Sequence, residues 1–256
     1  MIPADRRKKL LEFVNFRGSV TIGELSERFQ VSEMTIHRDL NYLETRGKVQ
    51  KTYGGVISNL SDIEIPFNSR LNTHIQEKVC IGKAAARLVE DGDSIIIDPS
   101  SSSYAMLREL LMLEKKDLTI FCTGLAALSL LSGNTSYQVF GVGGLLAPLT
   151  LEFVGNFTQN FLANIHADKY FAGVTGIHPD FGVTDPIQEE VAVKQRCAQS
   201  SNELIILADQ TKFGRVANFL TFSLDQINLI VTDGNEDHSH INAIQRARVE
   251  FLFAAN

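Results

Sequence analysis

Apolar positions in the first part of the chain recur with the 3.6-residue period of helices that bury one face. The spacing predicts three helices: roughly 3–16, a second that begins after Thr21, and 33–46. Two of them carry start signals. Thr21 and Glu24 form a T-x-x-E capping box, and Ser32 is a good N-cap for the third helix.

The third helix has two chemically different faces. Ile36, Leu40 and Leu43 form its core stripe, and the flanks and far side carry hydrogen-bonding groups: Thr35, His37, Arg38 and Asn41. The alternating segment 48–55 follows and predicts a basic β-wing. Two small helices, a short turn and a wing are typical of a helix-turn-helix that reads DNA. A three-helix packing unit with a solvated basic face is the alternative.

From residue 75 onward the pattern alternates between helix and strand. Apolar runs predict strands at 94–98, 118–122, 137–142, 168–174, 204–208 and 227–232. Helical segments are predicted between them at 76–90, 103–114, 124–132, 157–165 and 188–201. The end of the chain, 245–253, predicts a short helix and an edge strand. Near-continuous apolar strands separated by helices predict a mostly parallel α/β sheet covered on both faces.

Small, hydroxyl-bearing and charged residues follow these strands. Parallel strands bring their carboxyl ends to one edge of a sheet, where open α/β folds bind ligands. The candidate ligand-binding residues are therefore Asp98, Ser100, Ser101, Ser102, Ser103, Thr123, Gly124, Gly143, Gly144, Asp209 and Lys212. Serine hydroxyls and the N-terminus of the helix expected near Ser103 suit a phosphate, and Lys212 suits its counter-charge. The alternative is that strand ends are loops, which are rich in such residues anyway.

Charge is unevenly distributed along the 256 residues, whose formal net charge is −6. Residues 1–58 contain ten Lys or Arg and seven Asp or Glu. Residues 59–256 contain fourteen Lys or Arg and twenty-three Asp or Glu. A small basic head on an acidic body indicates that the head contacts a polyanion. Three widely spaced cysteines, no signal peptide and no apolar run of about 20 residues favour a reduced, cytoplasmic protein.

Other kinds of site find little support. The chain has no G-x-S-x-G elbow, dinucleotide fingerprint or P-loop, so no cofactor is expected. His238 and His240 could form half a metal site, but no third ligand is expected nearby, so no metal is predicted. Cys122 is interpreted as an inert buried side chain rather than a redox thiol.

The stretch VSEMTIHRDLNYLETRGKVQKTYGGV resembles the winged helix-turn-helix of the DeoR family of bacterial transcriptional regulators. The resemblance implies that Thr35, His37 and Arg38 read DNA, with Lys51 and Tyr53 on the wing. His37 stands where the family usually has Arg, and Tyr53 where His is common. Loss of a guanidinium removes a possible bidentate guanine contact worth about 1–3 kcal/mol of discrimination, so an unusual operator is expected.

The body resembles the DeoR-type sensor domain from IGKAAARLVEDGDSIIID to SSNELIILADQTKFG. This implies an α/β fold like ribose-phosphate isomerase, without the enzymatic activity, that binds a phosphorylated sugar. The family's loop D-x-G-(S/T)-(S/T) is replaced by Asp98-Pro-Ser-Ser-Ser-Ser, and its Thr-Asn by Cys122-Thr123. A Cβ at Ser100 is expected to limit a positive φ and close ligand approach. The pocket either has another preferred ligand or is insensitive.

The sequence thus predicts a winged helix-turn-helix domain at 1–58, a connector at 59–74 and an α/β effector-binding and oligomerisation domain at 75–256. The expected function is a sequence-specific transcriptional regulator that represses a sugar or polyol operon. Its expected partners are operator DNA, a phosphorylated sugar or related metabolite, and further copies of itself as a dimer or tetramer. The alternatives are an isomerase-like enzyme with an appended head, and a structural DNA-binding protein whose body only oligomerises.

Overall fold

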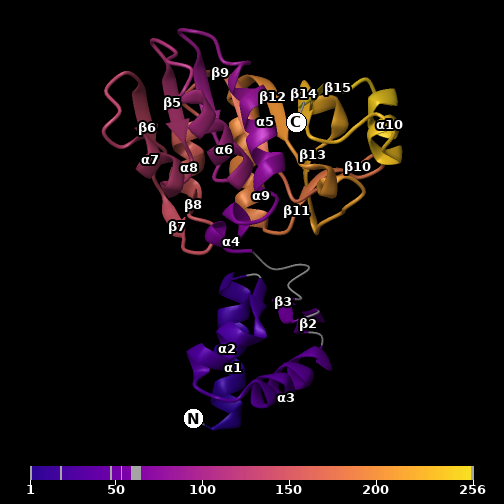
Figure 1. Cartoon of the computed structure of the whole chain (residues 1–256). Coiled ribbons are helices and arrows are strands. Elements are labelled where there is room, and N and C mark those ends of the chain that lie inside the picture. The colour runs from indigo at the N-terminus through magenta and orange to yellow at the C-terminus, as the bar shows by residue number, and fades with distance from the viewer. Residues whose placement is uncertain (1, 18, 47, 53, 59–64, 255–256) are drawn as a thin grey trace. The chain divides into compact units, whose positions relative to one another are not determined.

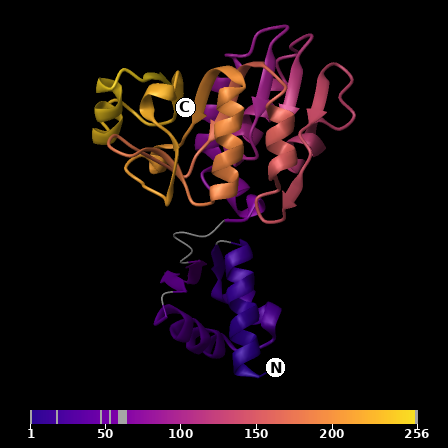
Figure 2. The ribbon, with the colours of Figure 1, turned by 180° about the vertical axis from the view of Figure 1, so that it is seen from behind.

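The computed structural model describes residues 2–17, 19–46, 48–52, 54–58 and 65–254, with the backbone alone for 15–17, 19, 57 and 58. The chain divides into two compact units, Met1–Thr73 and His74–Asn256, each described by itself below. Figure 1 shows the elements of both units, and Figure 2 shows the opposite side.

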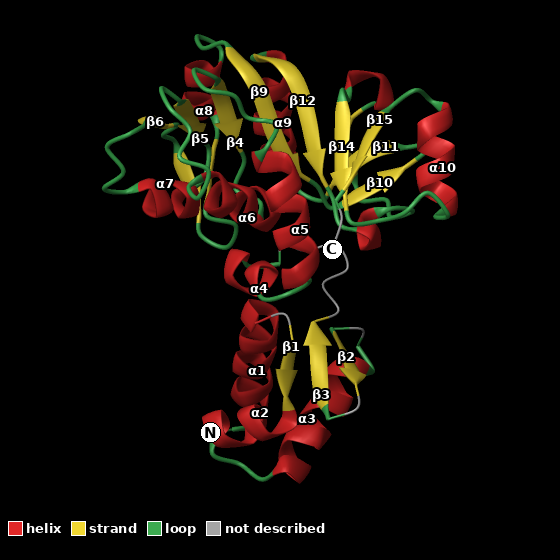
Figure 3. Ribbon diagram, turned by 45° about the horizontal axis from the view of Figure 1, so that its top comes forward, coloured by secondary structure: helices red, strands yellow, loops and turns green. Residues whose placement is uncertain are grey.

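The N-terminal unit is a winged helix-turn-helix, as predicted. Its helices are α1 (Pro3–Arg17), α2 (Ile22–Phe29), α3 (Glu33–Glu44) and α4 (Phe67–Leu71), the last within the predicted connector. Its strands are β1 (Ser19–Thr21), β2 (Val49–Thr52) and β3 (Gly55–Ser58), which form an antiparallel sheet in the order β1-β3-β2 (Figure 3). The wing is therefore three-stranded, and β1 is a strand that the pattern did not predict.

Local capping explains where these helices begin. The Thr21 side chain accepts from the Glu24 N–H at 3.2 Å, and the Ser32 hydroxyl accepts from the Thr35 N–H at 3.4 Å. Both N-cap predictions are confirmed. Gln30 adopts a left-handed conformation with φ of 51° and ends α2, which turns the chain into α3.

An ion pair is buried where α1 meets α3. The Asp39 carboxylate is fully buried. Arg6 Nε donates to one of its oxygens at 2.6 Å and Arg7 Nε to the other at 2.8 Å. Because a buried carboxylate without partners is costly, this pair fixes the position of α3 against α1.

The C-terminal unit is built on a seven-stranded, all-parallel sheet, which confirms the predicted α/β class. In chain order the strands are β4 (Ser94–Ile97), β5 (Thr119–Cys122), β6 (Gln138–Gly141), β9 (Ala167–Gly173), β12 (Ser201–Leu207), β14 (Leu229–Thr232) and β15 (Glu250–Phe253). Their order across the sheet is β15-β14-β12-β9-β4-β5-β6. The connecting helices are α5 (Ile75–Ala86), α6 (Ser101–Leu110), α7 (Leu125–Leu131), α8 (Asn156–Leu162), α9 (Gln188–Gln199) and α10 (Ser239–Arg246).

Both faces of this sheet are buried. Ile96 belongs to a core cluster with Tyr170 and Ala172, and its neighbours Ile95 and Ile97 belong to the cluster on the other face. This alternation explains why the parallel strands are apolar throughout. Among the described residues, no helix has the length and apolar character needed to span a bilayer.

Two small antiparallel sheets were not predicted. One pairs β7 (Leu145–Ala147) with β8 (Glu152–Val154). The other has the order β10-β11-β13 and consists of β10 (Gly176–His178), β11 (Gly182–Asp185) and β13 (Phe219–Phe222). Short 3₁₀ turns, η1 (Gln210–Lys212) and η2 (Leu224–Gln226), complete the unit. The C-terminal helix α10 lies earlier than predicted, and β15 is an edge strand as predicted.

We expect Asp39→Ala to destabilise the N-terminal unit by about 3 kcal/mol, because it leaves two part-buried guanidinium groups without their partner. Denaturant unfolding of the full chain, followed by a probe of that unit, measures the change. Glu33→Ala, which removes an exposed acid from the same helix, should change stability by about 0.5 kcal/mol or less. An Asp39→Ala variant as stable as this control would show that the buried pair contributes little.

Candidate functional sites

The outward face of α3 presents a row of hydrogen-bonding side chains. His37, Arg38 and Asn41 are exposed, on the side of the helix opposite the buried Ile36 and Leu40. Thr35, also predicted to read DNA, is partly exposed, and its hydroxyl lies 3.0 Å from that of Ser32. A helix with such a row has the dimensions and the donors to contact base edges in a major groove.

The wing is attached to this helix by two hydrogen bonds. Lys51 Nζ donates to Asn41 Oδ1 at 2.7 Å, and the Lys51 N–H donates to Glu44 Oε1 at 2.9 Å. Two of the predicted DNA-reading residues, one from the helix and one from the wing, are therefore in direct contact. Tyr53 lies outside the described residues.

A second cationic cluster borders the row. The Arg7 guanidinium lies 3.9 Å from the ring centroid of Tyr42, and the Arg46 guanidinium lies 3.7 Å from it. Cation–π contacts of this kind hold guanidinium groups in place near a surface. With Arg38 and Lys51, they give the helix and its wing a concentration of positive charge suited to phosphates.

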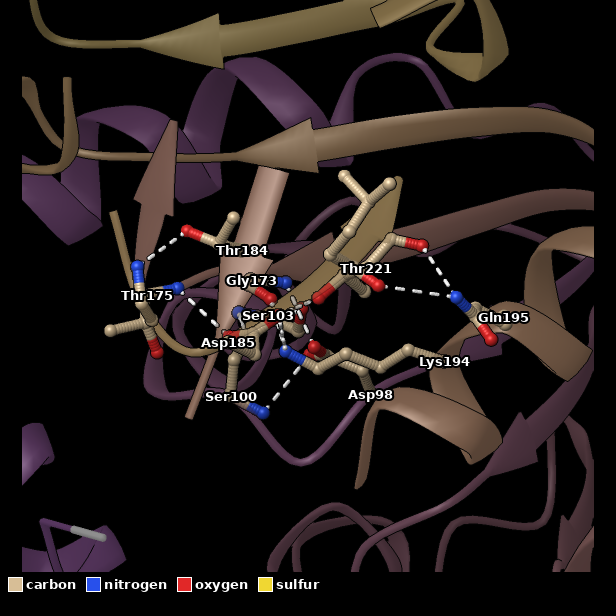
Figure 4. A network of polar contacts seen from close by, with 12 residues as sticks. Asp98, Ser100, Ser103, Gly173, Thr175, Thr184, Asp185, Lys194, Gln195 and Thr221 are labelled. Carbon is tan, nitrogen blue, oxygen red and sulfur yellow. Dashed lines mark hydrogen bonds and ion pairs between the residues drawn. The ribbon is translucent and has the colours of Figure 1, made fainter. Parts of the chain in front are cut away.

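In the C-terminal unit, polar groups converge where β4 and β9 end (Figure 4). Asp98 follows β4 directly, and its two carboxylate oxygens accept the N–H of Ser100 at 3.0 Å and the N–H of Gly173 at 2.8 Å. The carboxylate thus joins the serine loop to the end of the neighbouring strand. A bond from Asp98 to a ligand, as predicted, would have to be made in addition to these two.

The serine loop begins helix α6 two residues earlier than predicted. Ser100 has φ −74° and ψ 154° and is the N-cap, and its hydroxyl accepts the Ser103 N–H at 3.0 Å. The expectation that a Cβ at this position conflicts with a required positive φ is therefore wrong. Ser103 is fully buried, and its hydroxyl donates to the Phe171 carbonyl at 3.2 Å.

Two glycines make room for the residues in which this loop departs from the family pattern. A Cβ at Gly173 would overlap Ser100 Cβ and Oγ. A Cβ at Gly124 would lie 2.6 Å from the Cβ of Pro99. The side chains of Ser100 and Pro99 thus occupy space that a side chain at these glycines would need. Because both positions are glycine, Ser100 and Pro99 fit without distorting the backbone.

Few polar atoms at this edge remain without a protein partner. Ser101 and Ser102 are buried residues, and within the described chain their hydroxyls make no hydrogen bond. Asp209 is also buried; its Oδ1 accepts from the Thr211 N–H at 3.0 Å, and its Oδ2 has no partner among these residues. Buried polar atoms of this kind are the ones that a bound polar ligand would satisfy.

A buried ion pair beside the serine loop was missed by the sequence analysis. Lys194 Nζ lies 3.0 Å from Asp185 Oδ2 and donates to the Gly173 carbonyl at 2.9 Å (Figure 4). Burial lowers the pKa of Lys194, but the nearby carboxylates of Asp185 and Asp98 outweigh it and raise the pKa overall. The ammonium is therefore charged at neutral pH and places a fixed positive charge under this edge.

One sequence signal could have found Lys194. On α9 it occupies a core position with Glu190, Val191 and Cys197, which are buried on the same side of the helix. A lysine in the apolar stripe of a helix is almost never fully buried unless it is paired. Asp185 carried no comparable signal, because it lies in a short strand of the unpredicted β10-β11-β13 sheet.

The predicted ligand residues follow four strands, which together with β9 occupy five neighbouring positions in the sheet. Gly143 and Gly144 follow β6, Thr123 and Gly124 follow β5, and the residues from Asp209 to Lys212 follow β12. From β12 to β6 there are four interstrand spacings, or about 19 Å. This exceeds the length of a hexose phosphate, so one such ligand cannot contact both ends of the set. Gly143 and Gly144 instead line an open pocket of about 370 Å³ with Phe157 and Phe161.

No third histidine was expected near His238 and His240, but His178 lies beside them. The ring centroid of His240 is 5.6 Å from that of His178 and 5.6 Å from that of His238. Within the described residues, however, no group of three His, Cys, Asp or Glu is arranged to hold a metal ion. Burial raises the pKa of Cys122 to about 12, so its thiol stays protonated and unreactive.

Known proteins match both units. Residues 6–62 match the family model for the DeoR-like helix-turn-helix domain, and residues 73–234 match that for the DeoR C terminal sensor domain. An uncharacterized HTH-type transcriptional regulator, YulB of Bacillus subtilis, is 32% identical over 251 residues, covering 98% of this chain and 96% of its own. The lactose phosphotransferase system repressor of Staphylococcus epidermidis is 32% identical over 237 residues, which cover 91% of this chain and 92% of the repressor. Ribose 5-phosphate isomerase A from Methanocaldococcus jannaschii is similar in structure, with a TM-score of 0.42, 17% identity and 55% of each chain covered.

We expect Gly173→Ala to destabilise the C-terminal unit by about 2 kcal/mol, because the new Cβ overlaps Ser100. Adding Ser100→Gly should restore most of the loss, since the single Ser100→Gly change costs only a few tenths of a kcal/mol at an N-cap. A double-mutant cycle by denaturant unfolding measures the coupling. As a control, Gly143→Ala should be tolerated, because nothing lies within 4 Å of its added Cβ. If Gly173→Ala is equally tolerated, the two residues are not complementary.

Proposed function

The chain belongs to the DeoR family of DNA-binding transcriptional regulators, and we propose that it represses an operon of sugar or polyol metabolism until a phosphorylated sugar binds its C-terminal domain. Residues 1–58 read the operator and residues 75–256 bind the effector. The observation that carries the first part is the exposed row of His37, Arg38 and Asn41 on α3. Because DNA is in the cytoplasm of a bacterium, we place the protein there.

The DNA-reading residues divide into two groups. Arg38 and His37 have no protein partner that competes for their donors among the described residues, and they are suited to base edges in the major groove. Lys51, Arg7 and Arg46 are held at the border of α3 by Asn41 and Tyr42, and they are suited to phosphates. Base contacts then determine which DNA sequence is recognised, and phosphate contacts determine the register of the protein on the duplex.

The effector site that we propose lies at the N-terminus of α6. The hydroxyls of Ser101 and Ser102 and the first N–H groups of this ten-residue helix form a set of donors that suits a phosphate. The buried ammonium of Lys194 offsets part of the negative charge of Asp185 and Asp98 under the same edge, which lowers their repulsion of a phosphate. Asp209 Oδ2 accepts hydrogen bonds from the sugar hydroxyls. Asp209 follows β12, which is two strands from β4, so it lies about 10 Å from the serine loop. A pentose or hexose phosphate can span that distance.

This site is better suited to binding than to catalysis. The Asp98 oxygens accept two backbone N–H groups, and Lys194 is held protonated by Asp185, so neither group is available as a base. We propose that the domain is a sensor rather than an enzyme. The effector then changes operator affinity through its different affinity for the operator-competent and incompetent conformations. The relatives that match over most of their length include a named repressor of a sugar phosphotransferase system, which supports a sugar-linked signal.

We expect Arg38→Ala to weaken binding to the operator upstream of the protein's own operon by about 10- to 100-fold, the cost of one bidentate base contact. A fluorescence anisotropy titration of full-length protein at a stated salt concentration measures this, with random DNA as competitor. Binding to random DNA should weaken much less.

Arg108→Ala is the matched control, because Arg108 is an exposed arginine on α6 of the other unit. It should leave operator affinity unchanged. If Arg38→Ala binds the operator as tightly as the Arg108→Ala variant does, Arg38 does not read bases. If the wild-type protein does not prefer the operator to random DNA, the proposed regulator function is wrong.

We expect one or more pentose or hexose phosphates to raise the melting temperature of the C-terminal unit. A ligand at 100 times its dissociation constant contributes about 2.7 kcal/mol, which corresponds to several degrees for a domain of this size. Ser101→Ala with Ser102→Ala should abolish most of the shift at equal ligand concentration, because both hydroxyls that face the phosphate are removed. Differential scanning calorimetry of the full chain is the measurement.

Inorganic phosphate and the unphosphorylated sugars serve as ligand controls and should give smaller shifts. Ser129→Ala is the protein control, since Ser129 is an exposed serine in α7 away from the α6 N-terminus. If the double variant retains the full shift, the phosphate lies elsewhere. If no sugar phosphate in the panel shifts the wild-type protein, the body does not sense this class of ligand.

A further inference from the structure

The segment from Leu118 to Ile165 is almost free of charged residues. It contains 48 residues and a single charged one, Glu152, whose side chain is buried. At the average of 21% charged residues in this chain, a segment of that length would contain about ten. Every residue of the segment is described, so between these bounds no Asp, Glu, Lys or Arg side chain is exposed.

This segment forms one edge of the C-terminal unit. It includes β5, α7, β6, β7, β8 and α8, which lie together at the side of the unit away from α10 (Figures 1 and 2). β6 is the last strand of the seven-stranded sheet and pairs with β5 alone among the described strands. Its outer row of backbone N–H and C=O groups is therefore unpaired by any of them.

Large apolar side chains are exposed on the same edge. Phe157 is 84% exposed and Leu145 is 73% exposed, and three further residues are more than a third exposed: Leu125, Phe140 and Leu149. The open pocket lined by Gly143, Gly144, Phe157 and Phe161 lies among them. Phe140 stacks on the buried Phe121 with ring centroids 5.1 Å apart, and the centroid of Phe161 lies 6.5 Å from that of Phe121, so the ring on the edge strand and the ring beside the pocket pack against one core residue. These five exposed residues and the pocket together form an uncharged edge.

An edge of this composition is not typical of a surface that stays in water. Natural proteins protect free edge strands with charged side chains or proline, and β6, Gln-Val-Phe-Gly, has neither. Depletion of charge with enrichment of aromatic residues is instead the composition of interface cores. A partner that covers this edge would bury the exposed rings and close the pocket beside Gly143 and Gly144.

We propose that the partner is a second copy of this chain, which binds the uncharged edge of the first through the same edge in a two-fold interface. In such an interface both copies present the same surface, so the exposed apolar residues of one edge meet those of the other. Residues 59–256 contain fourteen basic and twenty-three acidic residues, and only one of the acidic residues, the buried Glu152, lies in the segment 118–165. The rest of the body carries an excess of acidic residues, so two copies that met through it would repel each other more than two copies that met through this edge. This assignment goes beyond the proposed function, which requires no particular contact surface.

Sedimentation equilibrium of the full chain tests the proposal. We expect the wild-type protein to be a dimer or a larger even-numbered assembly. Phe157→Glu and Leu145→Glu should each weaken association at least about 100-fold, or reduce a tetramer to a dimer, because each places two like charges in a desolvated contact. Two variants are used because both residues are exposed in the monomer and neither is needed for its core.

Met112→Glu is the matched control. Met112 is 79% exposed and lies outside the segment 118–165, so the same change there should leave association unaltered. Association of the wild-type protein should also change little between low and high salt, since no exposed charge takes part. Circular dichroism confirms that the variants are folded.

Three results would overturn the proposal. They are a monomeric wild-type protein, an assembly that is equally stable in Phe157→Glu, Leu145→Glu and Met112→Glu, and an assembly that salt dissociates as readily as an ionic contact. None of them bears on operator or effector binding, which are measured separately.

Discussion

The buried ammonium of Lys194 is the group on which the arrangement of the C-terminal unit depends. It extends from α9, donates to the carbonyl of Gly173 at the end of β9, and pairs with Asp185 in β11. An isolated buried charge costs several kcal/mol, so these three elements cannot separate without losing its compensation. Asp98 extends the same network to β4, because it accepts the Gly173 N–H and holds the first turn of the serine loop. One ion pair thus fixes the edge of the sheet at which we propose that the effector binds.

Most polar groups of this network hydrogen-bond to one another. The network therefore also determines which polar groups are left without a protein partner and could bind a ligand. Ser100 and Ser103 bond to each other and to Phe171, whereas Ser101 and Ser102 have no hydrogen-bond partner within the described chain. The departure from the family's glycine at position 100 is accommodated by the absence of a side chain at Gly173. The loop therefore keeps a regular helix start, and its four serines divide into two that hydrogen-bond within the protein and two whose hydroxyls have no partner among the described residues.

The sequence predicted what local signals and long apolar runs can specify. Thr21 and Ser32 are caps whose partners lie three residues away, and strands such as β4 are apolar throughout because both faces of the sheet are buried. Strands of three residues, such as β1 and β7, are too short to show a period, so they were missed. The Lys194–Asp185 pair was missed because its partners come from different elements, and only the tertiary fold brings them together.

Charge determines which surfaces of this protein can form contacts. At physiological ionic strength the Debye length is about 8 Å, so the acidic residues of 59–256 repel another chain or a DNA phosphate mainly at the surfaces that touch. The phosphates of DNA therefore have a favourable approach to the basic residues around α3 and an unfavourable one to the acidic outer surface of the body. A second acidic body meets less of this repulsion at an edge without exposed charge. The uneven distribution of charge along the sequence thus gives the face of α3 and the uncharged edge opposite chemistry: the first suits a polyanion, and the second suits an apolar partner.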